Sequence, residues 1–131
     1  SNYPVKEEYM VFCDSFEEAK KQTKRILELP EPPDGIFTVN DLTAAGAIQE
    51  IIATGHKVPE DIAVVGFTNS FISPLTNPTL STIDQNGFTM GQEAANILFQ
   101  RIKENEEKME NPITKLLDTD LIIRDSSNRK K

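Results

Sequence analysis

The sequence is poor in the side chains that most often carry chemistry. Among its 131 residues there is one cysteine, Cys13, and one histidine, His56. A single cysteine cannot form an intrachain disulfide, which suits a reducing cytoplasm. One histidine and one cysteine cannot supply the nitrogen and sulfur ligands of a zinc site, so we expect no metal centre. His56 follows the helix-ending Gly55 and is interpreted as structural.

Long apolar runs and cofactor-binding motifs are also lacking. No stretch of about 18 apolar residues occurs, and the N-terminus lacks the basic and then apolar pattern of a signal peptide, so no membrane segment is expected. The sequence contains no P-loop, no G-x-G-x-x-G turn and no G-x-S-x-G nucleophile elbow. We therefore expect no cofactor and no catalytic residue, and the sequence predicts a binding protein rather than an enzyme.

The sequence also has fewer basic residues than acidic ones. Lysine and arginine number 14 against 21 aspartates and glutamates, which gives a formal net charge of −7. Such a balance opposes attachment to the phosphates of DNA. The basic residues 129–131 form one short cluster at the end of the chain, which favours a solubilising role. We expect that this segment does not bind DNA by itself.

What the sequence does contain is a regular alternation of strands and helices. The predicted strands cover residues 9–13, 36–39, 62–67 and 80–83, with a last extended segment over 116–124. The predicted helices cover residues 15–29, 41–55 and 86–102. Ser15 opens a capping box for the first of these helices, and Asp41 is expected to cap the second. This order predicts an α/β fold, a three-layer parallel sheet flanked by helices.

Polar residues follow each predicted strand, where the ligand crevice of a parallel sheet lies. The pairs are Asp14 and Ser15, Asn40 and Asp41, Thr68 and Asn69, and Asp84 and Gln85. Their amide, hydroxyl and carboxylate groups suit hydrogen bonding to a sugar, a polyol or a base. Helix capping is the competing role for Ser15 and Asp41. Because Asp41 is expected to cap, Asn40 is the better ligand candidate.

Six motifs occur in a fixed order between residues 33 and 127. They are Pro33–Phe37 leading into Val39–Asp41, Ala45–Ala47, Val58–Phe67, Pro78–Ile83, Gln85 with Gly91, and Leu121–Ser127. Together they resemble the effector-binding domain of LacI/GalR-type transcription regulators. The resemblance implies the C-terminal lobe of a type I periplasmic-binding-protein-like fold, in which two α/β lobes close on a small ligand.

The resemblance also implies an effector site. Its residues would be Asn40, Asp41, Thr68, Asn69, Phe16, Asp14 and Gln85. In similar proteins the asparagine at the position of Asn40 commonly contacts the effector, and Phe16 is placed as the aromatic residue that stacks on it. Thr68 stands where the family usually has an aspartate that accepts hydrogen bonds from effector hydroxyls, so that carboxylate is missing here.

The same comparison implies a partial domain. Residues 1–131 would form the C-terminal lobe, residues 86–112 would cross to an N-terminal lobe, and the DNA-binding headpiece would lie elsewhere. The apolar face of the crossing helix, which includes Phe88, Ala95 and Leu98, then needs a new cover. We expect this helix either to mediate self-association or to change its position.

The function implied is sensing of a small, sugar-like molecule that controls operator binding allosterically in a full-length cytoplasmic regulator. DNA would be bound only through the headpiece. A homodimer is expected, with Ala45, Gln49, Ser73 and Thr76 at its interface. The alternative is a periplasmic sugar-binding protein of a transporter, which would share the fold.

Overall fold

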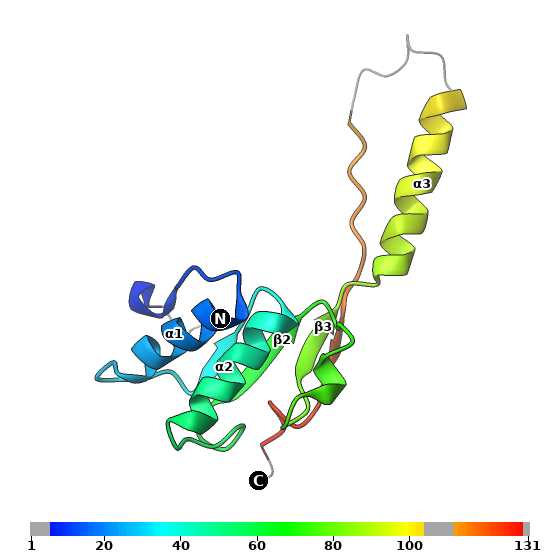
Figure 1. The fold of residues 1–131 in the computed structure, drawn as a ribbon. Helices are drawn as coiled ribbons and strands as arrows, with labels where there is room; N and C mark the ends of the chain where they lie inside the picture. Colours follow the sequence, from blue (N-terminus) through cyan, green and yellow to red (C-terminus); the bar gives the residue numbers. More distant parts are fainter. Residues whose placement is uncertain (1–5, 104–111, 130–131) are drawn as a thin grey trace.

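The computed structural model describes residues 6–103 and 112–129 as a four-stranded sheet with flanking helices (Figure 1). The strands are β1 (Gly35–Phe37), β2 (Ala63–Phe67), β3 (Ser81–Asp84) and β4 (Asp120–Ile122), in that order across the sheet. β1 and β3 run parallel to the central β2, and β4 is antiparallel to β3. The α/β class is confirmed, and the predicted last extended segment forms the antiparallel edge strand.

The core lies between α2 (Asp41–Ala53) and the sheet. It consists of Ala44, Ile48, Ile51, Ile62, Val64 and Leu80, each no more than 3% exposed. Alternation along β2 buries Val64 against α2, while its neighbours Ala63 and Val65 stay half-buried. α1 (Phe16–Leu27) packs on α2, and its buried residues are Ala19, Thr23 and Ile26. The Ser15 cap is confirmed, since its hydroxyl accepts the Glu18 N–H at 3.3 Å.

The predicted strand at residues 9–13 is wrong. Glu7–Tyr9 form a 3-10 helix (η1), and residues 10–14 have no regular structure. The segment is anchored away from β1, because Lys6 pairs with Glu31 and the Tyr9 hydroxyl donates to the Glu31 carbonyl at 2.6 Å. Its apolar side chains therefore line a cavity beside β1 instead of extending the ladder.

The residue that caps α2 is not the predicted one. Asn40 is the N-cap, and its side-chain oxygen accepts the Thr43 N–H at 2.9 Å. Asp41 is the first helical residue and is 1% exposed. The expectation that Asp41 caps the helix is therefore wrong, because its carboxylate points into the chain and is bonded there.

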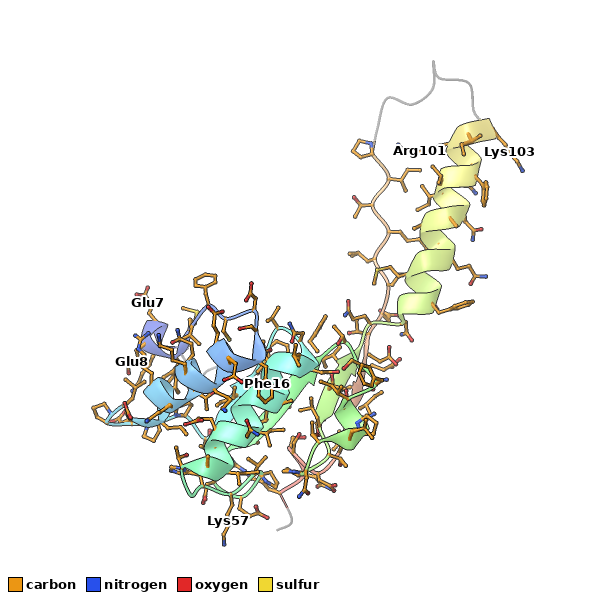
Figure 2. The ribbon with its side chains drawn as sticks, in the orientation of Figure 1. Glu7, Glu8, Phe16, Lys57, Arg101 and Lys103 are labelled. Carbon is orange, nitrogen blue, oxygen red and sulfur yellow. The ribbon has the colours of Figure 1, made fainter. Side chains whose placement is uncertain are left out.

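α3 (Gly87–Lys103) projects away from the rest of the structure, and the extended residues 112–119 run back beside it (Figure 1). Glu93 and Lys115 form an ion pair between the two segments. Arg101 and Lys103 lie at the far end of the helix (Figure 2). No residue of α3 is buried, and Phe88 on its apolar face is 86% exposed. The helix thus does not pack on the sheet; self-association through it stays a prediction, and residues 104–111 of the predicted crossing lie outside the described part.

We predict that Gly46→Ala destabilises the chain. A Cβ at Gly46 would lie 2.5 Å from the Phe16 carbonyl oxygen and 3.1 Å from the Ala19 Cβ, so α1 and α2 would have to move apart. Overpacking of this kind lowers the free energy of unfolding by about 1–3 kcal/mol. Gly91→Ala is the control, because a Cβ there meets nothing within 4 Å in an exposed helix. Urea unfolding followed by circular dichroism measures both; equal stability of the two variants would contradict this account of the α1–α2 contact.

Candidate functional site

The carboxyl ends of the three parallel strands meet at one edge of the sheet. Asn40 follows β1, Thr68 and Asn69 follow β2, and Gln85 follows β3. The structure therefore brings four of the predicted effector residues to a single edge. We call this edge, with the residues just named, the polar edge.

Asn40 is held in place but keeps a donor available. Its side-chain oxygen caps α2, and its carbonyl accepts the hydroxyls of Thr38 and Thr43, each at 2.8 Å. The hydrogen bond to the Thr43 N–H fixes the side-chain amide, while the two hydroxyls bond to the backbone carbonyl. Its Nδ2 donates to no residue in the described part of the chain. Because an amide has two N–H donors, Asn40 can serve as a cap and a ligand contact at once.

Thr68 and Asn69 turn the chain away from β2 in an uncommon backbone conformation. Their φ angles are 111° and 48°, and both residues are non-glycine. Positive φ at a β-branched residue such as Thr68 is an outlier that the surroundings must hold in place. The Thr68 N–H donates to the Ile83 carbonyl at 2.9 Å, and the side chain stays exposed. Thr68 is thus exposed at the polar edge, while its hydroxyl donates to Asp41 Oδ2 at 3.5 Å and keeps lone pairs that can accept a hydrogen bond.

Asn69 is committed to the protein itself. Its Nδ2 donates to Asp84 at 3.0 Å, and its Oδ1 accepts Nη2 of Arg124 at 3.0 Å. Arg124 also donates through Nη1 to the Leu80 carbonyl at 2.7 Å. Asp84 in turn accepts the N–H of Asn86, where the chain turns into α3, at 2.8 Å. This network fixes the polar edge to the beginning of α3.

Arg124 and Asp84 were not among the predicted site residues. Arg124 lies 55 residues from Asn69 in the sequence, so no local pattern links them. The available signal was the arginine at the end of the apolar run 121–123, which the sequence analysis treated only as part of a motif. Asp84 was recognised as following a strand, but its two bonds to backbone and amide donors could not be read from its position.

Asp41 lies beneath the polar edge rather than on it. Its Oδ1 accepts the Thr82 hydroxyl at 2.6 Å, and its Oδ2 accepts the Ser73 hydroxyl and the Ser70 N–H, each at 2.6 Å. The Thr68 hydroxyl is 3.5 Å from the same Oδ2. Both carboxylate oxygens are thus occupied inside the chain, and we assign Asp41 a structural role.

The other predicted effector residues lie differently. Gln85 is half-buried at the end of β3, and its side chain has no hydrogen bond within the described residues. Asp14 is exposed just before α1. Phe16 lines a separate groove of about 260 Å³. The structure therefore separates Phe16 from Asn40 and Thr68 and does not place it at the polar edge.

The groove beside Phe16 holds three of the four residues predicted for a dimer interface. Ala45, Gln49 and Thr76 line it. Ser73 does not, because it is fully buried at the start of η2 (Ser73–Leu75) and gives its hydroxyl to Asp41. A contact between Ser73 and a partner chain is therefore excluded by its burial, and the surface candidates are the other three.

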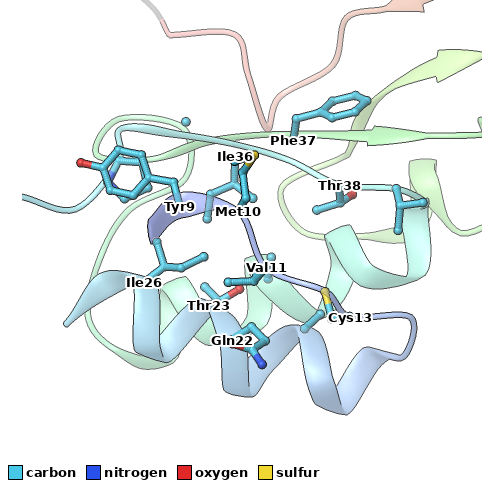
Figure 3. Close-up of a pocket in the computed structure, with 15 residues that line it drawn as sticks. Tyr9, Met10, Val11, Cys13, Gln22, Thr23, Ile26, Ile36, Phe37 and Thr38 are labelled. Carbon is cyan, nitrogen blue, oxygen red and sulfur yellow. The ribbon is translucent and has the colours of Figure 1, made fainter. Parts of the chain in front are cut away.

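A larger cavity of about 580 Å³ lies between the N-terminal segment, α1 and β1 (Figure 3). Its lining is mainly apolar and includes Met10, Val11, Ile26 and Ile36. Cys13 also lines it, and burial raises the pKa of this thiol above its usual range. Because a polyol needs hydrogen-bonding groups, the polar edge fits such a ligand better than this cavity does.

Within residues 6–103 and 112–129, no three side chains of the His, Cys, Asp or Glu type come together in a way that could hold a metal ion. None of the described helices is long and apolar enough to cross a membrane.

The fold is an α/β sheet with flanking helices, and polar residues follow the carboxyl ends of its three parallel strands. Residues 2–127 match the periplasmic binding protein-like domain family. The chain is 34% identical over 113 residues to the HTH-type transcriptional repressor CytR of Escherichia coli K12, covering 86% of this chain and 32% of that protein. It is 42% identical over 103 residues to the NTD biosynthesis operon regulator NtdR of Bacillus subtilis, covering 79% of this chain and 31% of that protein.

A LacI family transcriptional regulator from Enterococcus faecium, solved with bound ribose, has the same fold, with a TM-score of 0.74 and 28% identity over 89% of this chain and 42% of that one. The chain belongs to the periplasmic binding protein-like domain family, in the form found in LacI-type transcription regulators. It spans about a third of the length of the curated relatives just described.

The cap at Asn40 predicts a simple difference between two variants. Asn40→Ala removes the acceptor for the Thr43 N–H and should lower the free energy of unfolding by about 1 kcal/mol. Asn40→Ser keeps an oxygen at the N-cap and should stay within about 0.5 kcal/mol of the parent chain. Urea unfolding of the three proteins tests this. If the alanine variant were as stable as the serine variant, the cap would contribute nothing.

Proposed function

We propose that this chain is the C-terminal lobe of the effector-binding domain of a LacI-type regulator and senses a sugar or a related polyol. The observation that supports this most directly is the polar edge, where Asn40 and the exposed residue Thr68 follow two paired parallel strands and the Asn40 Nδ2 donates to none of the described residues. Asp41 connects the two residues, since it follows Asn40 in the chain and lies 3.5 Å from the Thr68 hydroxyl.

The chemistry of this edge favours a neutral, hydroxyl-rich ligand. Asn40 offers a donor, the Thr68 hydroxyl donates to Asp41 and can accept from a ligand, and Gln85 offers an amide that bonds to none of the described residues. Thr68 replaces the carboxylate that the family usually has here, so hydrogen bonds to the ligand are weaker at this position. The ribose-bound relative is consistent with a sugar as the ligand class.

The proposed mechanism is allosteric and involves no chemical reaction. An effector held between this lobe and a second lobe stabilises one arrangement of the two, and only its differential affinity for the arrangements can shift the equilibrium. The net charge of −7 opposes binding of this chain to DNA phosphates. We therefore assign operator binding to a headpiece elsewhere in the full-length cytoplasmic protein. The regulators among its relatives give no support to the transporter alternative.

The ligand prediction can be tested in the full-length parent protein. A panel of ribose, glucose, sucrose and cellobiose is screened by thermal shift, and the dissociation constant of the best ligand is measured by calorimetry. Asn40→Ser should weaken that affinity by about tenfold or more, because it removes the free amide donor while keeping the helix cap. The matched control is Asn128→Ser, the same substitution at an exposed position next to Arg129, which contacts Asp34 before β1 at the opposite end of the sheet, and it should leave the affinity unchanged.

Two results would contradict the proposed function. One is that no member of the panel changes the affinity of the full-length protein for DNA from its own upstream region. The other is a signal peptide in place of a helix-turn-helix at the start of the parent gene, which would revive the transporter alternative.

We further propose that the full-length protein is a homodimer that uses the groove lined by Ala45, Gln49 and Thr76. Ala45→Arg would place a long cation in this groove and should convert a dimer to a monomer. Light scattering after size-exclusion chromatography measures the change. Glu60→Arg, in an exposed turn away from the groove, is the control and should leave the mass unchanged. A dimer that persists in Ala45→Arg would move the interface elsewhere.

A further inference from the structure

A carboxylate that no ligand can reach is bonded on both of its oxygens. Asp41 is 1% exposed, and three donors lie 2.6 Å from its oxygens. The donors come from three places. They are the Thr82 hydroxyl on β3, the Ser73 hydroxyl at the start of η2, and the backbone N–H of Ser70 in the connection from β2 to η2. One side chain thus joins α2 to segments 29 to 41 residues further along the sequence.

Helix capping does not explain this arrangement. The N-cap is Asn40, whose oxygen already accepts the Thr43 N–H. The positive end of the α2 dipole favours a negative charge at its first residue, but that benefit is available to an exposed carboxylate as well. Burial instead brings the Asp41 carboxylate against β2, where a Cβ at position 66 would lie 2.3 Å from its Oδ1. Gly66 therefore provides the room that the buried carboxylate needs.

The bonds of Asp41 converge on the backbone corner that presents Thr68. Thr68 and Asn69 both have positive φ, and such a pair of non-glycine residues persists only where the surroundings fix it. The Ser70 N–H donates directly to Asp41, and the Asn69 N–H donates at 3.2 Å to the Thr82 hydroxyl, which itself donates to Asp41. Two successive amides of the corner therefore depend on one carboxylate.

We propose that Asp41 is a positioning residue, which holds the corner Thr68–Asn69 in its left-handed conformation and so fixes where Thr68 stands at the polar edge. It does this through Thr82, through Ser70 and through the Thr68 hydroxyl, which donates to Asp41 Oδ2 at 3.5 Å, and it does not touch the ligand. The inference rests on the proposed function only in treating the corner as effector-facing. The geometry of the corner is independent of which ligand binds.

Amide hydrogen exchange of this chain, followed by nuclear magnetic resonance, tests the proposal without a ligand. Thr82→Val removes the hydroxyl that accepts the Asn69 N–H and donates to Asp41. The amides of Asn69 and Ser70 should then exchange about tenfold faster or more, while the core amides of Ile51 and Val64 keep their rates. Thr82→Ser retains the hydroxyl and should restore the slow exchange.

Asp41→Asn is the second variant. It leaves one oxygen where there were two acceptors, so either Thr82 or Ser70 loses its partner, and the same two amides should exchange faster. Acceleration by one common factor across Asn69, Ser70, Ile51 and Val64 would show a global stability effect and overturn the positioning role. Unchanged exchange at Asn69 and Ser70 in both variants would also overturn it.

The outcome is separable from that of the sugar experiment. Local acceleration at the corner, together with no sugar binding by the parent protein, would support the positioning role and refute the proposed ligand. Sugar binding that is weakened by Asn40→Ser, together with uniform exchange in Thr82→Val, would support the ligand and refute the positioning role.

Discussion

The carboxylate of Asp41 is the contact on which the arrangement of this lobe depends. It lies at the point where the N-terminus of α2, the end of β2, the connection after it and β3 come closest together. A buried carboxyl group is costly unless donors surround it, and here the donors belong to the segments that must be held. Because Gly66 has no side chain, it leaves room for the carboxylate, and Ser73 is buried where its hydroxyl contacts the carboxylate. The residue types at positions 66 and 73 are thus both explained by this one interaction.

A second hydrogen-bond network, outside the core, also joins segments that are distant in the sequence. Asn69 lies between Asp84 and Arg124, and Asp84 also accepts the N–H of Asn86 at the turn into α3. The corner after β2 is thereby connected to the chain leaving β3 and to the strand that returns beside it. The polar edge and the beginning of the projecting helix are thus joined by one hydrogen-bond network.

The alternation of apolar strands and amphipathic helices was enough to predict the α/β class, and the capping box at Ser15 predicted the start of α1. It failed where distant contacts decide the outcome. Residues 9–13 have the apolar pattern of a strand, but Lys6 and Tyr9 anchor the segment to Glu31 and keep it from pairing with β1. Asn40 and Asp41 are both good caps by residue type, and only the donors gathered from 29 to 41 residues away decide which of them turns inward.

The polar edge itself shows why residue type alone could not assign the ligand contacts. Asn40 was preferred as a ligand candidate because its neighbour Asp41 was expected to cap, but residue type could not separate it from Asn69. Asn69 is bonded on both sides, while the Asn40 Nδ2 donates to none of the described residues. The two carboxylates at the strand ends, Asp41 and Asp84, are both engaged in fixing the chain. The groups left to meet a ligand there are neutral, so recognition must depend on the direction of hydrogen bonds rather than on charge. Direction is what a fixed backbone corner supplies, and it is why a buried acid can matter to a ligand that it never contacts.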